Sequence, residues 1–430
     1  MVLLALILAL LTAALGTPLV KRAPQVQPFK IDLSSGLPHL QALIQHTNIP
    51  TEAEALYPEA GLEFGMTLDL LRDLKTQWSD DFDWAQQEAE LNQVAQFTTT
   101  IGDQTLHFVH EKSSAEDAIP LLLIHGWPGS IQEFVPVIKP LTQPWTSPSG
   151  KTISFDVVVP SLPGFLFSSA PPKNWTNVQT GALFNTLMTE VLGYPQYTMH
   201  ATDWGADIGY RMYESFNETV RAALFVWYQF LPPTPQDIAD NNIVLNDIEK
   251  VTLQRSMDWL TIDQGYFQEQ TFKPNDIGLA LLDNPIGQLA YLGSIITRWS
   301  DPRAGTGPSV LTNSTILTAV SLYYLTGTFQ SAVWQYARNA GSFRTNYTQA
   351  PTDAPMFFSL FEYNIGFWPK QYVAKLGNLI SYKEHDFGGH FAGLDNPAAF
   401  IEDIREMGVY YASNELGQVG STTNQVPMAK

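Results

Sequence analysis

Short apolar runs alternate with amphipathic helical segments through the middle of this 430-residue chain. The runs Ile119–Ile124, Phe155–Val159, Tyr197–Ala201 and Arg221–Trp227 are almost free of charged residues. Such runs predict strands that are buried on both faces of a parallel sheet. Helical spacing fills the intervals between them, as in the segment that ends at Leu141. The pattern therefore predicts a mostly parallel, doubly wound α/β fold.

The strand pattern stops at the proline-rich segment Leu231–Pro235. From there to about residue 349 the apolar spacing is helical, and Asn284-Pro285 is typical of a helix start. Strands are predicted again at Met356–Tyr363 and Leu379–Lys383. We therefore expect a helical cap inserted between two parts of one sheet-based core.

The segment before the core mixes helix, loop and one hairpin. Leu68–Trp78 has the spacing of an amphipathic helix, and Phe97–His110 alternates around a Gly102-Asp103 turn, which predicts a β-hairpin. The predicted organisation is a signal peptide with a short propeptide at 1–22, an amino-terminal segment at 23–117, a first core part at 118–230, a cap at 231–349, a second core part at 350–412 and a flexible tail at 413–430.

The first residues have the composition of a secretory signal peptide. Met1–Gly16 is apolar and ends in small residues, and Lys21-Arg22 is similar to the dibasic sites that fungal secretory proteases cleave. The alternative is an uncleaved membrane anchor, because no charged residue precedes Lys21. Glycosylation sequons favour secretion to the extracellular space, and they begin at Asn174, Asn217, Asn313 and Asn346.

Composition excludes several classes of function. Only 15% of residues are charged, 45% are hydrophobic, and the formal net charge is −19. Such a surface repels nucleic acids and anionic lipid, so neither is an expected partner. The chain has no cysteine, and its eight histidines form no ligand-like cluster. We expect no metal and no cofactor.

The chemistry is expected at the end of the predicted strand Tyr197–Ala201. Asp203 follows this strand in a turn with small residues on both sides, Ala201 and Gly205, before a helix expected near residue 206. A sharp turn that presents a nucleophile needs small neighbours, because the backbone approaches closely there. The alternatives are a simple helix cap by Asp203 and a nucleophile at Asp207. The strand leads directly into Asp203, which favours that residue.

Eight stretches together resemble the epoxide hydrolases of the α/β-hydrolase fold, in their microsomal and fungal branch. The resemblance covers about residues 28–411 and rests on Phe82-Asp-Trp84, Gln87–Asn92, Gln96-Phe-Thr-Thr99, His107–His110, His125–Ser130, Pro160–Phe165, Asp203-Trp-Gly205 and Gly388–Ala392. It implies an amino-terminal segment that wraps the core and a helical cap that covers the site.

The resemblance also implies roles for an aspartate and two tyrosines. Asp203 would attack one ring carbon of a small apolar epoxide and form a covalent ester. Tyr266 and Tyr336 of the cap would hold and protonate the ring oxygen. Other tyrosines share the same aromatic-rich pattern, namely Tyr210, Tyr323 and Tyr324.

A histidine is then needed to activate water for hydrolysis of the ester. His390 is the candidate, because it lies in a glycine-flanked turn after the last predicted strand. The backbone N–H groups of Trp127 and Trp204 would bind the oxyanion. His125 is interpreted as a structural residue whose loop shapes that oxyanion pocket.

The chain departs from the family pattern at two places. Ala201-Thr202 stands where the family usually has two glycines before the nucleophile. In Phe367–Gln371, Gln371 stands where the resemblance implies the acid that orients the histidine, and an amide cannot balance an imidazolium charge. Three other acids, Glu362, Glu384 and Asp386, are not obvious replacements.

The leading hypothesis is a secreted epoxide hydrolase that is slow in its second step. A haloalkane dehalogenase also uses an Asp-Trp elbow, but two cap tyrosines do not suit a halide. A serine esterase is disfavoured because no Gly-x-Ser-x-Gly occurs. A non-enzymatic relative that binds an apolar ligand is the competing class. Among protein partners, only a homodimer is considered.

Overall fold

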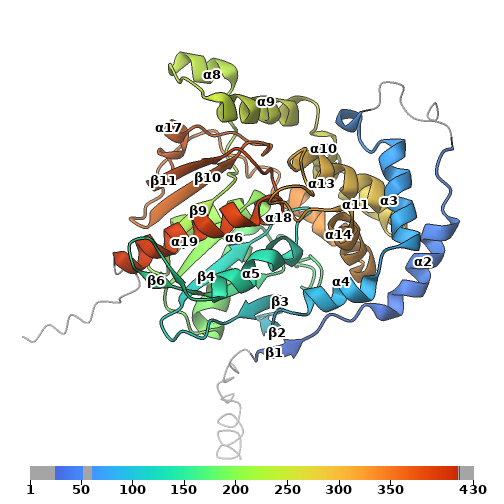
Figure 1. Ribbon diagram of the computed structural model, residues 1–430, viewed down its shortest axis with the longest axis horizontal. Coiled ribbons are helices and arrows are strands. Elements are labelled where there is room, and N and C mark those ends of the chain that lie inside the picture. The colour runs from blue at the N-terminus through green and yellow to red at the C-terminus, as the bar shows by residue number, and fades with distance from the viewer. Residues whose placement is uncertain (1–24, 52–60, 415, 417–430) are drawn as a thin grey trace, which may run out of the picture.

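The structure is a computed structural model that describes residues 25–51, 61–414 and 416 (Figure 1). The predicted signal peptide, the dibasic site and nearly all of the predicted tail lie outside these residues. Within the described ranges, no helix combines the length and the apolar character that crossing a membrane requires.

A nine-stranded sheet forms the centre of the molecule, in the order β1-β2-β3-β7-β4-β8-β9-β10-β11. From β7 to β11 all neighbouring strands are parallel. The strands are β1 Gln27–Phe29, β2 Gln96–Ile101, β3 Gln104–Glu111, β4 Ile119–Ile124, β7 Phe155–Pro160, β8 Tyr197–Ala201, β9 Val220–Phe225, β10 Pro355–Phe361 and β11 Asn378–His385, and β5 Trp145–Thr146 pairs separately with β6 Thr152–Ile153. The predicted core strands and the α/β-hydrolase fold are confirmed.

Both faces of the sheet are covered by helices, since every residue of β8 and β10 is buried. Figure 1 shows α5 and α19 crossing in front of the strands, where they pack against each other. The pair α6 and α7 packs together, and α7 contacts β4, β8 and β9. The core helices are α5 Val135–Thr142, α6 Asn177–Thr186, α7 Asp203–Ser215, α17 Lys370–Val373, α18 Ala392–Asp395 and α19 Pro397–Ser413.

The amino-terminal segment forms the antiparallel edge of the sheet and then packs against the cap. The predicted hairpin is confirmed as β2 and β3, with Gly102 in the left-handed conformation of its turn. The segment's helices α2 Leu37–His46, α3 Leu68–Asp80 and α4 Trp84–Leu91 lie beside cap helix α14 at the right of Figure 1. The Trp78 indole N–H donates to the Ser321 hydroxyl at 3.1 Å, which ties α3 to α14.

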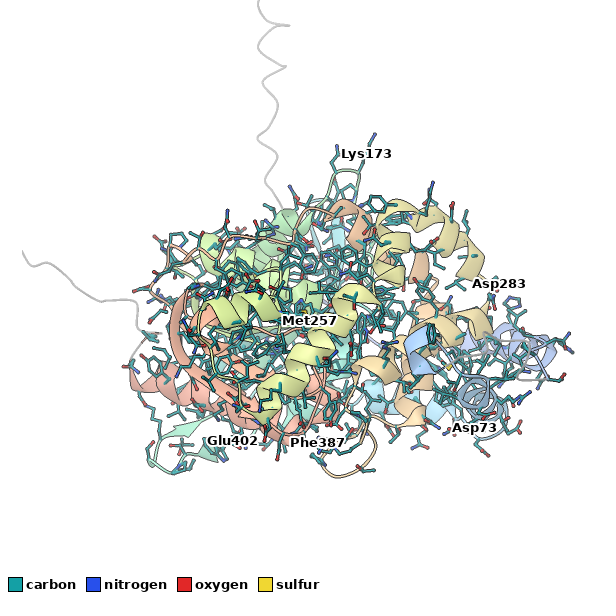
Figure 2. All side chains as sticks on the ribbon, turned by 90° about the horizontal axis from the view of Figure 1, so that it is seen from above. Asp73, Lys173, Met257, Asp283, Phe387 and Glu402 are labelled. Atoms are coloured by element: carbon teal, nitrogen blue, oxygen red, sulfur yellow. The ribbon has the colours of Figure 1, made fainter. Side chains whose placement is uncertain are left out.

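The cap is helical, as the sequence predicts. Its helices are α8 Pro235–Asp240, α9 Asp247–Thr261, α10 Gly265–Phe272, α11 Pro274–Leu281, α12 Pro285–Gln288, α13 Ser294–Trp299, α14 Asn313–Thr326, α15 Phe329–Ala332 and α16 Trp334–Arg338. Seen from above in Figure 2, α9 crosses the molecule with Met257 near the centre. Asp283 of the cap and Asp73 of α3 lie at one end, where cap and amino-terminal segment meet.

Candidate active site

Four loops at the carboxyl ends of parallel strands bring the candidate residues together. Trp127 follows β4, Asp203 follows β8, and His390 follows β11. Asn364 follows β10. Carboxyl ends of parallel strands meet at one edge of a sheet, which is where open α/β sheets bind their ligands.

Asp203 occupies a sharp turn with a φ of +49°. A left-handed conformation is costly for a residue with a side chain, and it is typical of functional turns. A Cβ at Gly205 would lie 2.4 Å from the Ile124 carbonyl oxygen, so only glycine fits there. Helix α7 begins at Asp203 itself, which corrects the predicted start near residue 206, because Ala206 N–H already donates to the Thr202 carbonyl.

The two candidate aspartates differ in their surroundings. Asp207 is buried inside α7, where its carboxylate accepts from the Asn177 amide at 2.7 Å and from Arg211 Nε at 3.1 Å. These bonds give Asp207 a structural role, while Asp203 lies at the strand end. The departure at Ala201 is accommodated by Gly209, whose added Cβ would lie 2.6 Å from the Ala201 Cβ.

The Asp203 carboxylate is held by a backbone donor. The Trp127 N–H donates to Asp203 Oδ1 at 2.7 Å. A Cβ at Gly126 would lie 2.2 Å from the same oxygen, so the close approach of this loop requires a glycine. Trp204 is the second residue of α7, where helix N–H groups have no acceptor within the helix, and its role as the second donor remains a prediction.

His390 faces the other oxygen of the Asp203 carboxylate. Its Nε2 lies 3.3 Å from Asp203 Oδ2, and its side chain is 1% exposed. The Trp227 and Trp299 rings pack edge-on against the imidazole, with centroids 5.3 and 5.1 Å away. His390 is therefore enclosed by aromatic rings, with one nitrogen directed at Asp203.

The orienting partner of His390 is an amide, but it is Asn364 and not Gln371. His390 Nδ1 lies 2.9 Å from Asn364 Oδ1, and the Asn364 amide donates to the Val226 carbonyl at 2.8 Å. That donation directs Oδ1 toward the imidazole, so Nδ1 carries the proton and Nε2 is the free base. Gln371 is exposed on α17. The assignment of Gln371 to the acid's position is wrong, because the turn after β10 brings Asn364 beneath the histidine.

Two of the three other acids considered from the sequence have partners elsewhere, and the third is exposed. Glu362 forms an ion pair with Arg303 at 3.4 Å, and Glu384 accepts from the Asn246 amide at 2.6 Å. The Asp386 side chain lies at the surface. Among the described residues, the only carboxylate within 4 Å of a His390 ring nitrogen is that of Asp203.

The loop that carries His390 is fixed by two buried aspartates. The Gly388 N–H donates to Asp301 at 2.8 Å, and the Gly389 N–H donates to Asp395 at 3.0 Å. Burial raises the pKa of Asp395 to about 8. Sequence reasoning missed this pair, because Asp301 lies in the cap and Asp395 lies in α18.

The two predicted phenols lie on the cap helices α10 and α16, which pack against each other. The Tyr266 ring stacks on Trp127 with centroids 5.4 Å apart, and the Tyr336 ring packs edge-on against both Trp127 and Tyr266. The Tyr266 hydroxyl accepts from Trp259 Nε1 at 3.2 Å, which leaves its own proton to donate. The Tyr336 hydroxyl is buried beside the side chains of Trp204 and Tyr266, and both interact with it.

Burial is the main cause that raises the pKa of both phenols well above the ordinary value, and the Asp203 charge raises it further. Both hydroxyls are therefore protonated at neutral pH and can act as donors. The other tyrosines are engaged elsewhere: Tyr210 donates to backbone carbonyls, Tyr323 to the Gly129 carbonyl and Tyr324 to Asp283.

His125 has a structural environment, as the sequence indicates. Its Nδ1 lies 2.9 Å from the Gly126 carbonyl, and its Nε2 accepts from the Leu162 N–H at 3.2 Å. Burial lowers the pKa of His125 to about 4, so the ring is neutral. It fixes the loop that carries Trp127.

A cavity of about 420 Å³ is lined by Tyr266, one of the two predicted phenols, together with Arg298, Trp299 and Leu62 of the amino-terminal segment. No cluster of three or more potential metal ligands occurs in the described ranges. All four sequon asparagines are exposed.

Two family models match the chain. One, described as "Epoxide hydrolase N terminus", matches residues 26–134, and the other, "alpha/beta hydrolase fold", matches residues 119–246. A putative epoxide hydrolase of Stigmatella aurantiaca is 34% identical over 89% of this chain and 84% of its own length. Epoxide hydrolase 1 of Sus scrofa is 28% identical over 89% of this chain and 88% of its own.

Solved structures of epoxide hydrolases are also similar to this chain. Aspergillus niger epoxide hydrolase superposes with a TM-score of 0.76 at 30% identity, covering 90% of this chain and 96% of that one. Juvenile hormone epoxide hydrolase of the silkworm Bombyx mori has a TM-score of 0.80 at 22% identity, covering 93% and 98%, and supports the fold. The similarity thus extends over core, cap and amino-terminal segment.

Proposed function

The chain belongs to the epoxide hydrolases of the α/β-hydrolase fold, and from this premise we propose that it converts small apolar epoxides to vicinal diols through an ester on Asp203. The observation that carries the proposal is the placement of the Asp203 carboxylate. One oxygen accepts from Trp127 N–H, and the other faces His390 below the two cap phenols.

In the first step, Asp203 Oδ2 attacks one ring carbon and the bond from that carbon to the ring oxygen breaks. The ring oxygen takes a proton from Tyr266 or Tyr336 and becomes the hydroxyl of a hydroxyalkyl ester. Both phenols are protonated at neutral pH because burial raises their pKa, so the proton is available when the ring opens.

In the second step, a water molecule attacks Cγ of Asp203 while His390 Nε2 takes its proton. The carbonyl oxygen Oδ1 becomes an oxyanion next to the Trp127 N–H, which stabilises it. The ester bond from Cγ to the alkyl oxygen then breaks, that oxygen takes the proton from His390, and the diol leaves. The proton left on the Asp203 carboxyl group then returns through solvent to the tyrosinate formed in the first step, so the carboxylate and the phenol are both restored.

The amide at Asn364 slows this second step. During water activation His390 becomes an imidazolium among the rings of Trp227 and Trp299. The Asn364 oxygen orients the ring but cannot balance its charge. Ring opening does not need that charge, so the ester is expected to accumulate during turnover.

Incubation with styrene oxide tests the proposal. Wild-type protein should form the diol, and mass spectrometry of quenched samples should show an adduct on the peptide that contains Asp203. A protein that yields neither diol nor adduct contradicts the proposal. A protein that yields diol without an adduct contradicts only the slow second step.

We further propose that the protein is secreted and glycosylated. The support is the apolar start of the chain together with four exposed sequon asparagines. Treatment of secreted material with an N-glycosidase should lower its mass, and an unchanged mass would refute the glycosylation.

A further inference from the structure

A segment of the cap is bonded directly to the loop that carries His390. The cap segment comprises residues 299–303, where α13 ends, and the loop comprises residues 386–390, which we call the histidine loop. The His390 N–H donates to the Trp299 carbonyl at 2.8 Å. A Cβ at Gly389 would lie 2.5 Å from the same carbonyl oxygen, so the two backbones are in close contact. The histidine loop is therefore held by the cap as well as by the core.

Arg303 makes the contacts at the other end of this cap segment. Its Nε and Nη2 donate to the two carboxylate oxygens of Asp301 at 2.8 and 2.7 Å, and Nη2 also donates to the Asp386 carbonyl at 2.6 Å. Asp301 in turn accepts from the Gly388 N–H at 2.8 Å. Arg303 is thus joined to the histidine loop directly, through Asp386, and indirectly, through Asp301.

The Asp301 carboxylate depends on Arg303 for its charge. The Asp301 side chain is 0% exposed, whereas that of Arg303 is 46% exposed. Burial by itself would raise the pKa of Asp301, but the bonds from Arg303 and Gly388 and the Arg303 charge lower the pKa below its ordinary value. Without Arg303, a buried carboxylate would lose its cation, which is costly. Asp301 and the loop bonded to it would then shift.

The Arg303 guanidinium also lies over two aromatic rings from different segments. Its Cζ is 4.4 Å from the centre of the Phe387 ring and 5.3 Å from that of the Tyr363 ring. A cation is attracted to the face of such a ring. Phe387 belongs to the histidine loop, and Tyr363 directly precedes Asn364. The guanidinium therefore spans the two segments whose spacing sets the 2.9 Å contact between His390 and Asn364.

We propose that Arg303 is a positioning residue for hydrolysis of the ester, so that the cap serves both steps of the reaction. Tyr266 and Tyr336 of the cap act in ring opening. Arg303 holds the segments of His390 and Asn364 in the geometry that water activation needs. It acts through these segments and not on the reacting atoms. This inference rests on the proposed function.

Single-turnover experiments with styrene oxide test the role of Arg303, because the adduct on Asp203 forms in the first step and disappears in the second. Arg303→Gln should form the adduct at close to the wild-type rate. It should slow loss of the adduct by about 10-fold or more, since a displacement of about 1 Å at a catalytic group can cost about 100-fold. Arg303→Lys keeps the charge but lacks the planar fork, so it should restore part of that rate.

Arg344→Gln is the matched control, because Arg344 has the same kinds of contact at another place. It forms two bonds to the Glu214 carboxylate, at 2.6 and 2.8 Å. Its guanidinium also lies over two rings, those of Tyr210 and Phe230. None of these partners belongs to the histidine loop. Arg344→Gln should therefore leave the ratio of adduct loss to adduct formation unchanged, and urea unfolding measures how much stability each variant loses.

Adduct loss at the wild-type rate in Arg303→Gln overturns the positioning role, and so does an equal slowing of both steps, which a purely structural role would cause. If the wild-type protein releases diol too fast for an adduct to be seen, Arg303→Gln should make the adduct detectable, and its absence would refute the role. Where Arg303→Gln does not fold, Arg303→Lys carries the same comparison. A wild-type protein that yields neither adduct nor diol refutes the proposed function, and the role of Arg303 fails with it.

Discussion

The imidazole of His390 is oriented by the side-chain amide of Asn364, with 2.9 Å between Nδ1 and Oδ1. Asn364 is fully buried, and its own N–H donates to the Val226 carbonyl. The amide thus fixes the tautomer of His390 without supplying a negative charge. This arrangement separates two functions of a catalytic acid, orientation of the base and stabilisation of its cation.

Asn364→Asp should speed hydrolysis of the ester by about 10-fold or more, since a carboxylate both orients the imidazole and balances its charge. The gain in rate is limited, because the substitution also removes the hydrogen bond that the Asn364 amide donates to the Val226 carbonyl. A carboxylate oxygen then lies next to that carbonyl oxygen and repels it. The rate of adduct loss in single-turnover mass spectrometry measures this step.

Gln371→Glu is the matched control, because it adds the same charge at an exposed position. It should leave adduct loss unchanged. An effect of Gln371→Glu as large as that of Asn364→Asp would mean that the charge acts at long range and not through the hydrogen bond to His390.

Asp203→Asn should abolish both adduct and diol while the protein stays folded, because an amide is not a competent nucleophile but still accepts from Trp127 N–H. Asp207→Asn should have the opposite effect: the protein loses stability but keeps its activity. It weakens the buried pair with Arg211 and should cost about 1–3 kcal/mol of unfolding free energy, with little change in kcat of the folded protein. Loss of the adduct in Asp207→Asn alone would assign the nucleophile to Asp207.

The core strands and the sharp turn at Asp203 could be predicted from the sequence because local patterns determine them. Buried strands such as β4 and β8 are continuous apolar runs, and the turn at Asp203 needs small residues nearby. These features depend on neighbours along the chain. The residue that contacts His390 depends instead on how the segment after β10 folds.

Two residues in that segment illustrate the difference. The family resemblance implied Gln371 as the partner of the histidine, but Gln371 lies in α17 and is exposed. Asn364 lies three residues after Phe361, where β10 ends. A bond from the Tyr363 N–H to the Gly388 carbonyl joins this turn to the histidine loop. The sequence did contain one indication of the role of Asn364, because it is a polar residue close to the end of a buried strand. The cavity beside Tyr266 had no such signal, because its walls come from distant parts of the chain.

Tyr266→Phe and Tyr336→Phe should each slow formation of the ester, by about 10-fold or more, and the double variant should be far slower. Tyr266→Phe also removes the acceptor of Trp259 Nε1, which should cost about 1–3 kcal/mol of unfolding free energy. Rapid-quench measurement of the adduct and urea unfolding test the two effects separately.

Tyr324→Phe serves as the control for these variants, because its hydroxyl donates to Asp283 away from the site. It should form the ester at the wild-type rate. A double Tyr266→Phe, Tyr336→Phe variant that also keeps the wild-type rate would show that another group protonates the ring oxygen.

Asp395 should make the protein less stable as pH rises from about 5 to 8. Burial raises the pKa of Asp395 in the folded protein to about 8, from an ordinary value of 3.8. Between these values the folded state keeps a proton that the unfolded chain releases. The unfolding free energy therefore falls with increasing pH, by up to about 1.4 kcal/mol per pH unit from this one group. Asp395→Asn keeps a neutral group that accepts from the Gly389 N–H, so it should flatten the decline.

Urea unfolding at pH 5 and pH 8 measures the effect, with Asp73→Asn as a control that makes the same substitution at an exposed position. Glu133 remains in every variant, and burial also raises its pKa, so part of the decline should persist in Asp395→Asn. The informative quantity is therefore the change in unfolding free energy between pH 5 and pH 8, compared between Asp395→Asn and Asp73→Asn. If Asp395→Asn and Asp73→Asn lose the same stability between pH 5 and pH 8, then Asp395 is ionised in the folded protein, and the loop before His390 is held by a carboxylate throughout this range.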